Sequence, residues 1–172
     1  MIVNLQRKIK IDAKAFAPFA ENVIMAVEEA EDCEIAVAFV SDRRMKELNK
    51  FFRGKDSTTD VLSFPHIEDE FEQELPPKGG TPNSGTPNGG TPNSGTPNGG
   101  TPNSGTPNGF LGDIVISVEQ AQKQAAENGL TLEAEIKQLM LHGVLHLCGY
   151  DHETDDGEMN ERELELRDKL GL

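Results

Sequence analysis

The chain has 172 residues, 30 of them acidic and 16 basic, so its formal net charge is −14. No apolar run approaches the roughly 18 residues that a membrane-spanning helix needs, and the first eight residues turn polar too early for a signal peptide. Two cysteines make no disulfide framework, so we expect a reducing, cytoplasmic location. The negative charge argues against binding to nucleic acid or membrane over the whole surface, but it is compatible with a local basic patch.

Hydrophobic periodicity predicts alternating strands and helices along the chain. In chain order we expect a strand at 2–6, a helix at 11–30, a strand at 34–41, a helix at 42–52, strands at 60–65 and 112–117, and helices at 118–127, 131–147 and 155–170. Asp42 is the predicted N-cap of the second helix, and Asp155 with Glu158 resembles a capping box. This order favours an α+β (mixed α/β) fold, with a small, mostly four-stranded sheet covered by about five helices.

A low-complexity tract separates the third and fourth predicted strands. Six Gly-Thr-Pro-Asn units occupy residues 80–108, and they contain no apolar side chain that could be buried. A proline at every fifth position blocks both helices and sheet ladders. We interpret residues 77–109 as a flexible insertion in a single domain that spans 1–172, with a tether or a partner-binding tract as the functional alternative.

Three of the four histidines fall within eleven residues, at His142, His146 and His152. The first two are four residues apart on the predicted helix, so they project from one face and can bind a single ion. Gly149 allows the chain to reverse and bring His152 back as a third ligand. Three imidazoles with one open position are typical of a catalytic zinc site, so we expect one Zn²⁺ ion here.

The same spacing occurs in zinc peptidases of the His-Glu-x-x-His type, but the glutamate position is Gly143 in this chain. Peptide hydrolysis by that route therefore lacks its general base. Asp151 could orient a ligand, accept a proton or simply form a turn. Cys148 is expected to be a buried core residue because it points away from the histidines, and His66 is assigned no role.

Six basic residues lie between positions 43 and 55. The acidic residues near them up to Lys55 are Asp42, directly before this segment, and Glu47 within it. Such a strip is often no more than a solvated helix face, but it can also contact phosphates. Arg53 is the member of most interest because its planar guanidinium suits bidentate binding to a phosphodiester.

Three segments together resemble the YbeY endoribonuclease family, and they occur in the family's order at 48–65, 111–117 and 142–152. The resemblance implies a single metallo-hydrolase domain that acts as a zinc-dependent endoribonuclease specific for single strands. It also implies roles in maturation of the 3′ end of small-subunit ribosomal RNA and in ribosome quality control. On this resemblance the metal ligands are His142, His146 and His152, and the essential arginine is Arg53. The expected partners are single-stranded RNA, ribosomal RNA and the small subunit, without membrane or DNA.

A second interpretation is an RNA-binding ribosome-assembly factor with a structural zinc and little hydrolysis. For an enzyme, we expect zinc to polarise a phosphoryl oxygen, activate a water or do both. Arg53 would stabilise the negative charge that develops on phosphorus. The general base stays open among bound hydroxide, Asp151 and the 2′-hydroxyl of the RNA.

Overall fold

The computed structural model describes residues 1–66, 109–151 and 156–172. Its strands are β1 (Ile2–Asn4), β2 (Glu34–Val40), β3 (Val61–Pro65) and β4 (Phe110–Ser117). Its α-helices are α1 (Ala17–Ala26), α2 (Asp42–Arg53), α3 (Val118–Asn128), α4 (Leu132–Leu147) and α5 (Glu158–Leu170), with short 3₁₀ helices at Ala13–Phe16 and Glu28–Ala30.

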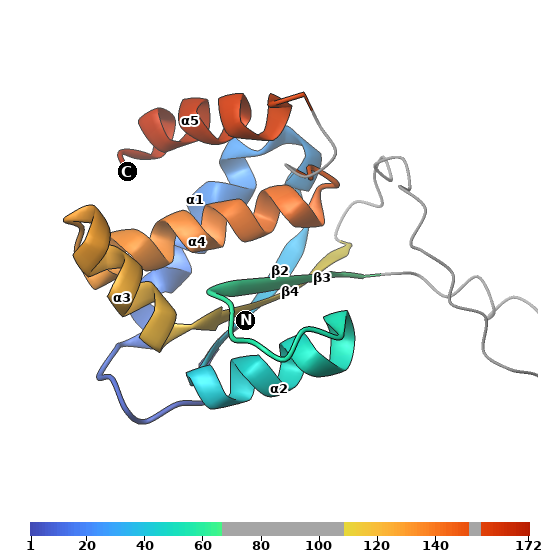
Figure 1. The fold of residues 1–172 in the computed structure, drawn as a ribbon. Coiled ribbons are helices and arrows are strands. Elements are labelled where there is room, and N and C mark those ends of the chain that lie inside the picture. Colours follow the sequence, from blue (N-terminus) through green and yellow to red (C-terminus); the bar gives the residue numbers. More distant parts are fainter. Residues whose placement is uncertain (67–108, 152–155) are drawn as a thin grey trace, which may run out of the picture.

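The strands form one mixed sheet in the order β1-β2-β4-β3. β1, β2 and β4 run parallel, whereas β3 pairs antiparallel with β4. Helix α2 covers one face of the sheet, and α1 and α4 cover the other, with α5 stacked outside them (Figure 1). The α+β prediction is therefore confirmed. The order of the strands, which the sequence did not reveal, makes β2 and β4 the two inner strands of the sheet.

The central strand β4 serves both layers because its side chains alternate between the two faces of the sheet. Ile114 and Ile116 are fully buried in the large core beneath α1 and α4. Val115, between them, packs in a smaller cluster with Met45 of α2 and Leu62 of β3. A strand covered on both faces is expected to read as an apolar run, as the segment 114–116 does.

The predicted helix at 11–30 is wrong as a single element, because the structure divides it into a 3₁₀ turn, α1 and a second 3₁₀ turn. Pro18 lies in the first turn of α1, where its missing N–H costs no helical hydrogen bond. At the other end, Val27 adopts an extended backbone with ψ of 107°, which stops the helix after Ala26. Val27 is fully buried, so packing of its side chain outweighs continuation of the helix.

Two predicted caps also differ from the structure. The N-cap of α2 is Ser41, whose hydroxyl accepts a hydrogen bond from the backbone N–H of Arg44. Asp42 is the first helical residue. Its carboxylate accepts hydrogen bonds from the hydroxyl of Ser117, at the end of β4, and from the amide of Gln120 in α3. Helix α5 begins after Gly157 as N-cap, and the predicted capping residue Asp155 lies outside the described residues.

The predicted insertion at 77–109 lies outside the described residues except for Gly109. Its two flanks are held together by β3 and β4, since the backbone N–H of His66 donates to the carbonyl of Leu111 at 3.0 Å. None of the helices in the described part of the chain is long and apolar enough to cross a membrane.

Gly143 sets how closely α4 approaches the sheet. A Cβ atom at this position would lie 2.9 Å from Cγ2 and 3.0 Å from Cδ1 of Ile114 on β4. The backbone of α4 therefore lies directly against β4. The carbonyl of Gly143 also accepts a hydrogen bond from the Ser63 hydroxyl of β3 at 3.2 Å. A glutamate, which zinc peptidases need at this position, cannot be accommodated.

We expect Gly143→Ala to destabilise the protein by about 1–3 kcal/mol, since the added methyl group overpacks the contact with Ile114. The sign is informative because alanine in a helix is otherwise favoured over glycine by about 1 kcal/mol. Urea denaturation of the variant and the parent protein measures the difference. A variant as stable as the parent would contradict the close packing described here.

Candidate active site

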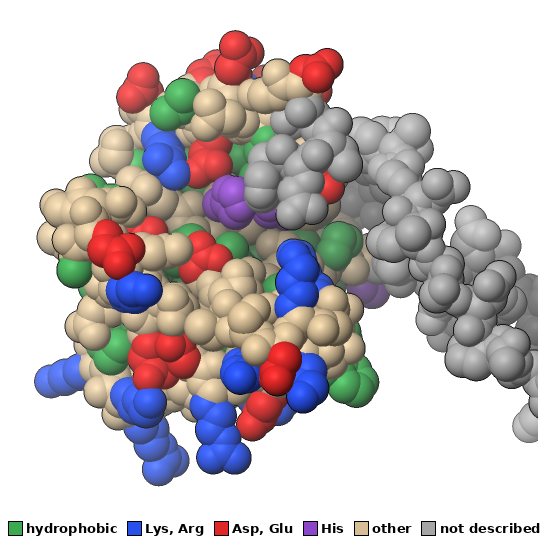
Figure 2. All heavy atoms as spheres, viewed as in Figure 1, with side chains coloured by type: hydrophobic (Ala, Val, Ile, Leu, Met, Phe, Trp, Pro, Cys, Tyr) green, Lys and Arg blue, Asp and Glu red, His purple; other side chains and the backbone are tan. Residues whose placement is uncertain are grey.

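Two of the three predicted metal ligands lie together on α4. His142 and His146 are one helical turn apart, and their Nε2 atoms are 3.1 Å from each other. The rings cross nearly at right angles, with an interplanar angle of 79° and centroids 4.7 Å apart. In Figure 2 histidine side chains lie at the surface between the α5 layer and the sheet. The third predicted ligand, His152, lies outside the described residues.

The other nitrogen of each ring is bound to the protein. Nδ1 of His146 lies 2.8 Å from the carbonyl oxygen of Tyr150, which can only accept, so this nitrogen donates. Nδ1 of His142 lies 3.0 Å from Oε2 of Glu163 on α5. With both Nδ1 atoms donating, each neutral ring presents the lone pair of its Nε2 toward the other ring.

This donor set fits a zinc ion. Two facing lone pairs repel each other unless a cation lies between them, and imidazole nitrogen is a preferred ligand of zinc. The 3.1 Å separation is near the roughly 3.3 Å expected for two nitrogens bound to one tetrahedral zinc. Histidines that ligate metals also commonly donate their second N–H to a carboxylate or a carbonyl, as these two do. Within the described residues, no group of three or more His, Cys, Asp or Glu side chains is placed so that it could hold a metal ion.

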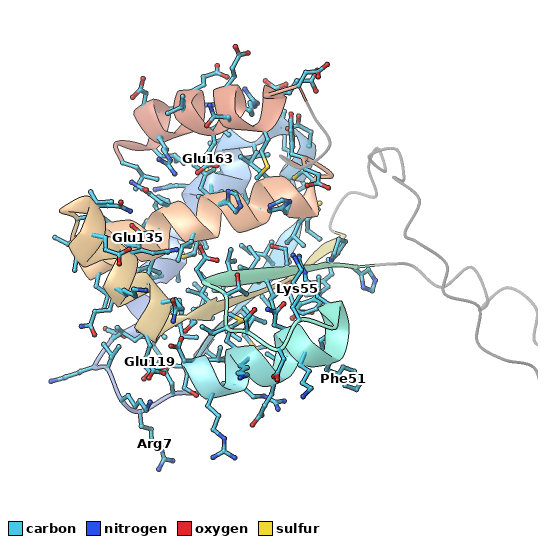
Figure 3. The ribbon with its side chains drawn as sticks, in the orientation of Figure 1. Arg7, Phe51, Lys55, Glu119, Glu135 and Glu163 are labelled. Carbon is cyan, nitrogen blue, oxygen red and sulfur yellow. The ribbon has the colours of Figure 1, made fainter. Side chains whose placement is uncertain are left out.

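Glu163 is the carboxylate that orients His142, and sequence analysis missed it. Its side chain is buried, and burial by itself raises the pKa of the carboxyl group. Hydrogen bonds from His142 and from Arg167, at 3.0 and 2.5 Å, outweigh burial and lower that pKa below its ordinary value. Figure 3 shows Glu163 reaching from α5 toward α4. The carboxylate is therefore ionised at neutral pH and holds the Nδ1–H tautomer of His142.

Tyr150 positions the second histidine through its backbone. Gly149, with φ of +95°, turns the chain after α4 so that the carbonyl of Tyr150 points back to His146. The Tyr150 hydroxyl donates to Oε1 of Glu29 at 2.7 Å, and this bond is the main reason that the pKa of Tyr150 rises to about 12. The ring is thus tied to the 3₁₀ helix at Glu28–Ala30, which fixes the turn that carries the carbonyl.

The basic strip of α2 divides into a neutralised part and an unpaired end. Arg43 and Arg44 both pair with Glu47, and Lys46 and Lys50 both pair with Asp56. Among the described residues, Arg53 and Lys55 form no ion pair. Uncompensated positive charge therefore gathers where α2 ends at Gly54. Figure 3 shows Lys55 between α2 and α4.

Two exposed phenylalanines accompany these charges. Phe51 and Phe52 are 81% and 57% exposed, and their rings pack edge to face with centroids 4.9 Å apart. Phe52 also packs against Phe64 of β3, which anchors the pair to the sheet. Aromatic rings next to unpaired Lys and Arg side chains are typical of surfaces on which single-stranded nucleic acid stacks.

Comparisons with known proteins agree on one family. A model of the family described as Endoribonuclease YbeY matches residues 1–171. The chain belongs to the YbeY endoribonuclease family. The protein named Endoribonuclease YbeY from Caldanaerobacter subterraneus subsp. tengcongensis is 36% identical, with 96% of this chain and 94% of the relative covered. That from Nautilia profundicola is 40% identical over 82% of this chain and 75% of the relative. The solution structure of TM1509 from Thermotoga maritima is also similar, with a TM-score of 0.53 and 25% sequence identity. The match covers 97% of the present chain and 86% of the TM1509 chain.

The sequence of this YbeY family member singled out three further residues, Cys148, Asp151 and His66. Cys148 is buried, as predicted, and burial is the main cause that raises the pKa of its thiol to about 12. A thiol of this kind is neither a nucleophile nor a ready metal ligand. Asp151 follows directly after the carbonyl that binds His146, and His66 packs against Phe110 at the far end of the β3–β4 pair.

A cavity of about 750 Å³ begins at His142 and extends along α4. It lies among the C-terminal half of α3, the face of α4 that carries Glu135 and His142, and the side of α5 that carries Glu163 and Arg167. The side chains that matter for its chemistry are Asp60, Gln124, Glu135, His142, Glu163 and Arg167. Nothing in the sequence pattern linked these residues, because they come from three helices, α3, α4 and α5, and from the segment just before β3.

Glu135 is the most unusual member of this cavity. It is only 5% exposed, and burial is the main cause that raises the pKa of its carboxyl group, with a further rise from Asp60. Asn128 and Arg167 lower the pKa without cancelling that effect. The folded protein therefore binds a proton at Glu135 more readily than the unfolded chain does, and an ionised Glu135 reduces stability.

We expect Glu163→Gln to weaken zinc binding by about 10- to 100-fold, since it removes the charged acceptor that fixes His142. Competition with a chromophoric chelator measures the affinity without any assay of activity. Glu165→Gln is the matched control, because Glu165 is 68% exposed on the same helix and its ion pair within the described residues is with Arg162. Equal zinc affinity in the two variants would argue against the orienting role.

We expect Glu135→Gln to raise the melting temperature at neutral pH by roughly 1–4 °C, since it removes a buried charge. The sign follows from the raised pKa of Glu135. Above that pKa the parent protein carries the ionised carboxylate and is less stable. At lower pH the carboxyl group is neutral, so the variant no longer melts at a higher temperature than the parent. Thermal unfolding between pH 4 and pH 8 tests this, with Glu133→Gln, 66% exposed, as the control.

Proposed function

We propose that this chain is a zinc-dependent endoribonuclease that cleaves single-stranded RNA. The observation that carries the proposal is the pair of Nε2 atoms, 3.1 Å apart, whose rings are held by Glu163 and by the carbonyl of Tyr150. His142 and His146 would bind the ion together with His152. Relatives from several bacteria that bear the name Endoribonuclease YbeY support the choice of RNA as substrate.

The proposed natural substrate is ribosomal RNA, at the 3′ end of the small-subunit RNA, in ribosome maturation and quality control in the cytoplasm. The unpaired charges at Arg53 and Lys55 suit this substrate because they supply a local phosphate-binding surface on a protein whose net charge is −14. The exposed rings of Phe51 and Phe52 favour a single strand, whose unpaired bases are free to stack.

When bound, zinc supplies a Lewis acid that polarises a phosphoryl oxygen and acidifies water. The protein contributes orientation and charge. Glu163 and Tyr150 keep the two imidazoles in the tautomer in which Nδ1 carries the proton and Nε2 carries a lone pair. Arg53 would supply a guanidinium for the negative charge that develops on phosphorus, and this kind of stabilisation acts in the transition state.

Glu163 does not fit the role of general base. Both of its oxygens already accept hydrogen bonds, from His142 and Arg167, and these bonds lower the pKa of its carboxyl group despite burial. Proton transfer in the proposed reaction therefore involves Asp151, water or the 2′-hydroxyl of the RNA itself.

We expect Arg53→Ala to lower kcat on a single-stranded RNA by about 100- to 1000-fold, with a much smaller loss of RNA affinity. His142→Ala should abolish cleavage and thus exclude a contaminating nuclease. Arg43→Ala is the matched control, because Arg43 is 88% exposed on the same helix and pairs with Glu47.

The same measurement separates the enzyme from an RNA-binding assembly factor. If the chain were only an RNA-binding protein, the main effect of Arg53→Ala would be a loss of RNA affinity. The parent protein, loaded with zinc, would then not cut single-stranded RNA. Gel assays of cleavage together with fluorescence anisotropy of bound RNA distinguish these results.

A further inference from the structure

Three buried polar atoms lack a hydrogen-bond partner in the described part of the chain, and all three belong to residues that line the cavity beside His142. They are Oε1 of Gln124, Oε2 of Glu135 and Nε of Arg167. A buried polar atom without a partner costs roughly 1–3 kcal/mol, so such atoms are rare in folded proteins. Their concentration in one cavity of about 750 Å³ indicates a surface that is completed by a ligand.

The remaining contacts define what each group offers. The amide nitrogen of Gln124 donates to Oδ2 of Asp60 at 3.1 Å, so the amide oxygen is the atom left without a partner. A terminal nitrogen of Arg167 donates to Oε1 of Glu163 at 2.5 Å, and Nε–H of the same guanidinium is the buried donor without a partner in the described part of the chain. The cavity thus offers two acceptors and one donor.

Glu135 is the carboxylate in this cavity that has an oxygen to spare. Both oxygens of Asp60 accept hydrogen bonds, from Thr59, Val61 and Gln124, and both oxygens of Glu163 are used as described above. The Asn128 side chain donates a hydrogen bond to this carboxylate, and Oε2 is the oxygen without a partner in the described part of the chain. Each carboxylate oxygen has two lone pairs, so both oxygens can still accept a hydrogen bond from a ligand. Such a carboxylate repels a phosphate group, but it accepts readily from N–H groups.

Among the four RNA bases, guanine matches this set of groups. Its pairing edge carries two adjacent donors, N1–H and N2–H₂, which can bond to both oxygens of one carboxylate, and an O6 acceptor beside them. Adenine and cytosine carry one amino group next to a ring nitrogen with a lone pair, and uracil carries one N–H between two carbonyls. An ionised carboxylate therefore pairs less well with these three bases.

We propose that the cavity binds the guanine base of the nucleotide adjacent to the phosphate held at the histidine pair, with Glu135 accepting from N1–H and N2–H₂. This inference rests on the proposed ribonuclease function. Glu135 precedes His142 by seven residues, so the two side chains share one face of α4 and are separated by about 10.5 Å along its axis. Figure 3 shows Glu135 on α4, and both residues line the cavity. A phosphate and the pairing edge of its neighbouring base are separated to a similar extent.

The binding experiment uses the full-length protein, loaded with ZnCl₂, and isothermal titration calorimetry with GMP, IMP, AMP, CMP and UMP. The five probes share the phosphate and ribose, and IMP differs from GMP only by the missing N2 amino group. We expect GMP to bind roughly 10- to 100-fold more tightly than the other four, as one or two hydrogen bonds to a charged group provide. Equal binding of the five nucleotides would overturn the inference, as would a preference for another base.

The variant Glu135→Gln should remove the preference for GMP over IMP, because an amide N–H then faces an N–H of guanine. Glu133→Gln, on the exposed side of α4, should retain it. Since Glu135→Gln is expected to be at least as stable as the parent, a loss of selectivity in a folded variant cannot be attributed to unfolding. Retained selectivity in Glu135→Gln would assign the preference to other groups and contradict the role of this carboxylate.

Cleavage assays then separate this inference from the proposed function. Uridine-rich single-stranded RNAs with one central guanosine, inosine or adenosine should be cut next to guanosine about ten times faster than next to the other two. Cutting without a base preference would leave the endoribonuclease in place and remove the guanine site. Selective GMP binding without cleavage of any RNA would support the guanine site and contradict the proposed endoribonuclease function.

Discussion

Two hydrogen bonds from the far nitrogens of His142 and His146 determine what this molecule can do. Each ring could rotate or exchange its tautomer if Nδ1 were free, and the two Nε2 atoms would then not face each other. The two acceptors belong to different elements, one to α5 and one to the turn after α4. The position of both elements relative to α4 is therefore a condition for the proposed metal binding, and the close contact between Gly143 and Ile114 fixes α4 on the sheet.

Charge is distributed around the histidines in a way that the net value of −14 conceals. On one side, the end of α2 offers Arg53 and Lys55 without acidic partners among the described residues. On the other side, the cavity between α3, α4 and α5 is rich in carboxylates. A polynucleotide has the complementary division, with anionic phosphates along its backbone and N–H groups on its base edges. The two surfaces can therefore engage different parts of the same strand.

Local patterns in the sequence predicted the local features of the structure. The spacing of His142 and His146 required only a helix, and the α+β class followed from the order of apolar segments. The partners of the two rings could not be predicted in this way, because Glu163 is 21 residues from His142 and lies in an acidic run that resembles a solvated helix face. The neutralisation of Lys46 and Lys50 by Asp56 likewise depends on the turn after α2 folding back. Val27 interrupts a good helical pattern because burial of its side chain outweighs helix propensity.

The antiparallel pairing of β3 with β4 has a consequence for chain connectivity. Pro65 and Gly112 are register partners, so the chain leaves and re-enters the sheet at neighbouring positions on its edge. Closing a loop there costs only about 0.6 kcal/mol for each doubling of its length. This point is therefore suited to protein engineering: a reporter domain grafted here, or new termini created by circular permutation, would leave the helices that carry the histidines and Glu163 uninterrupted.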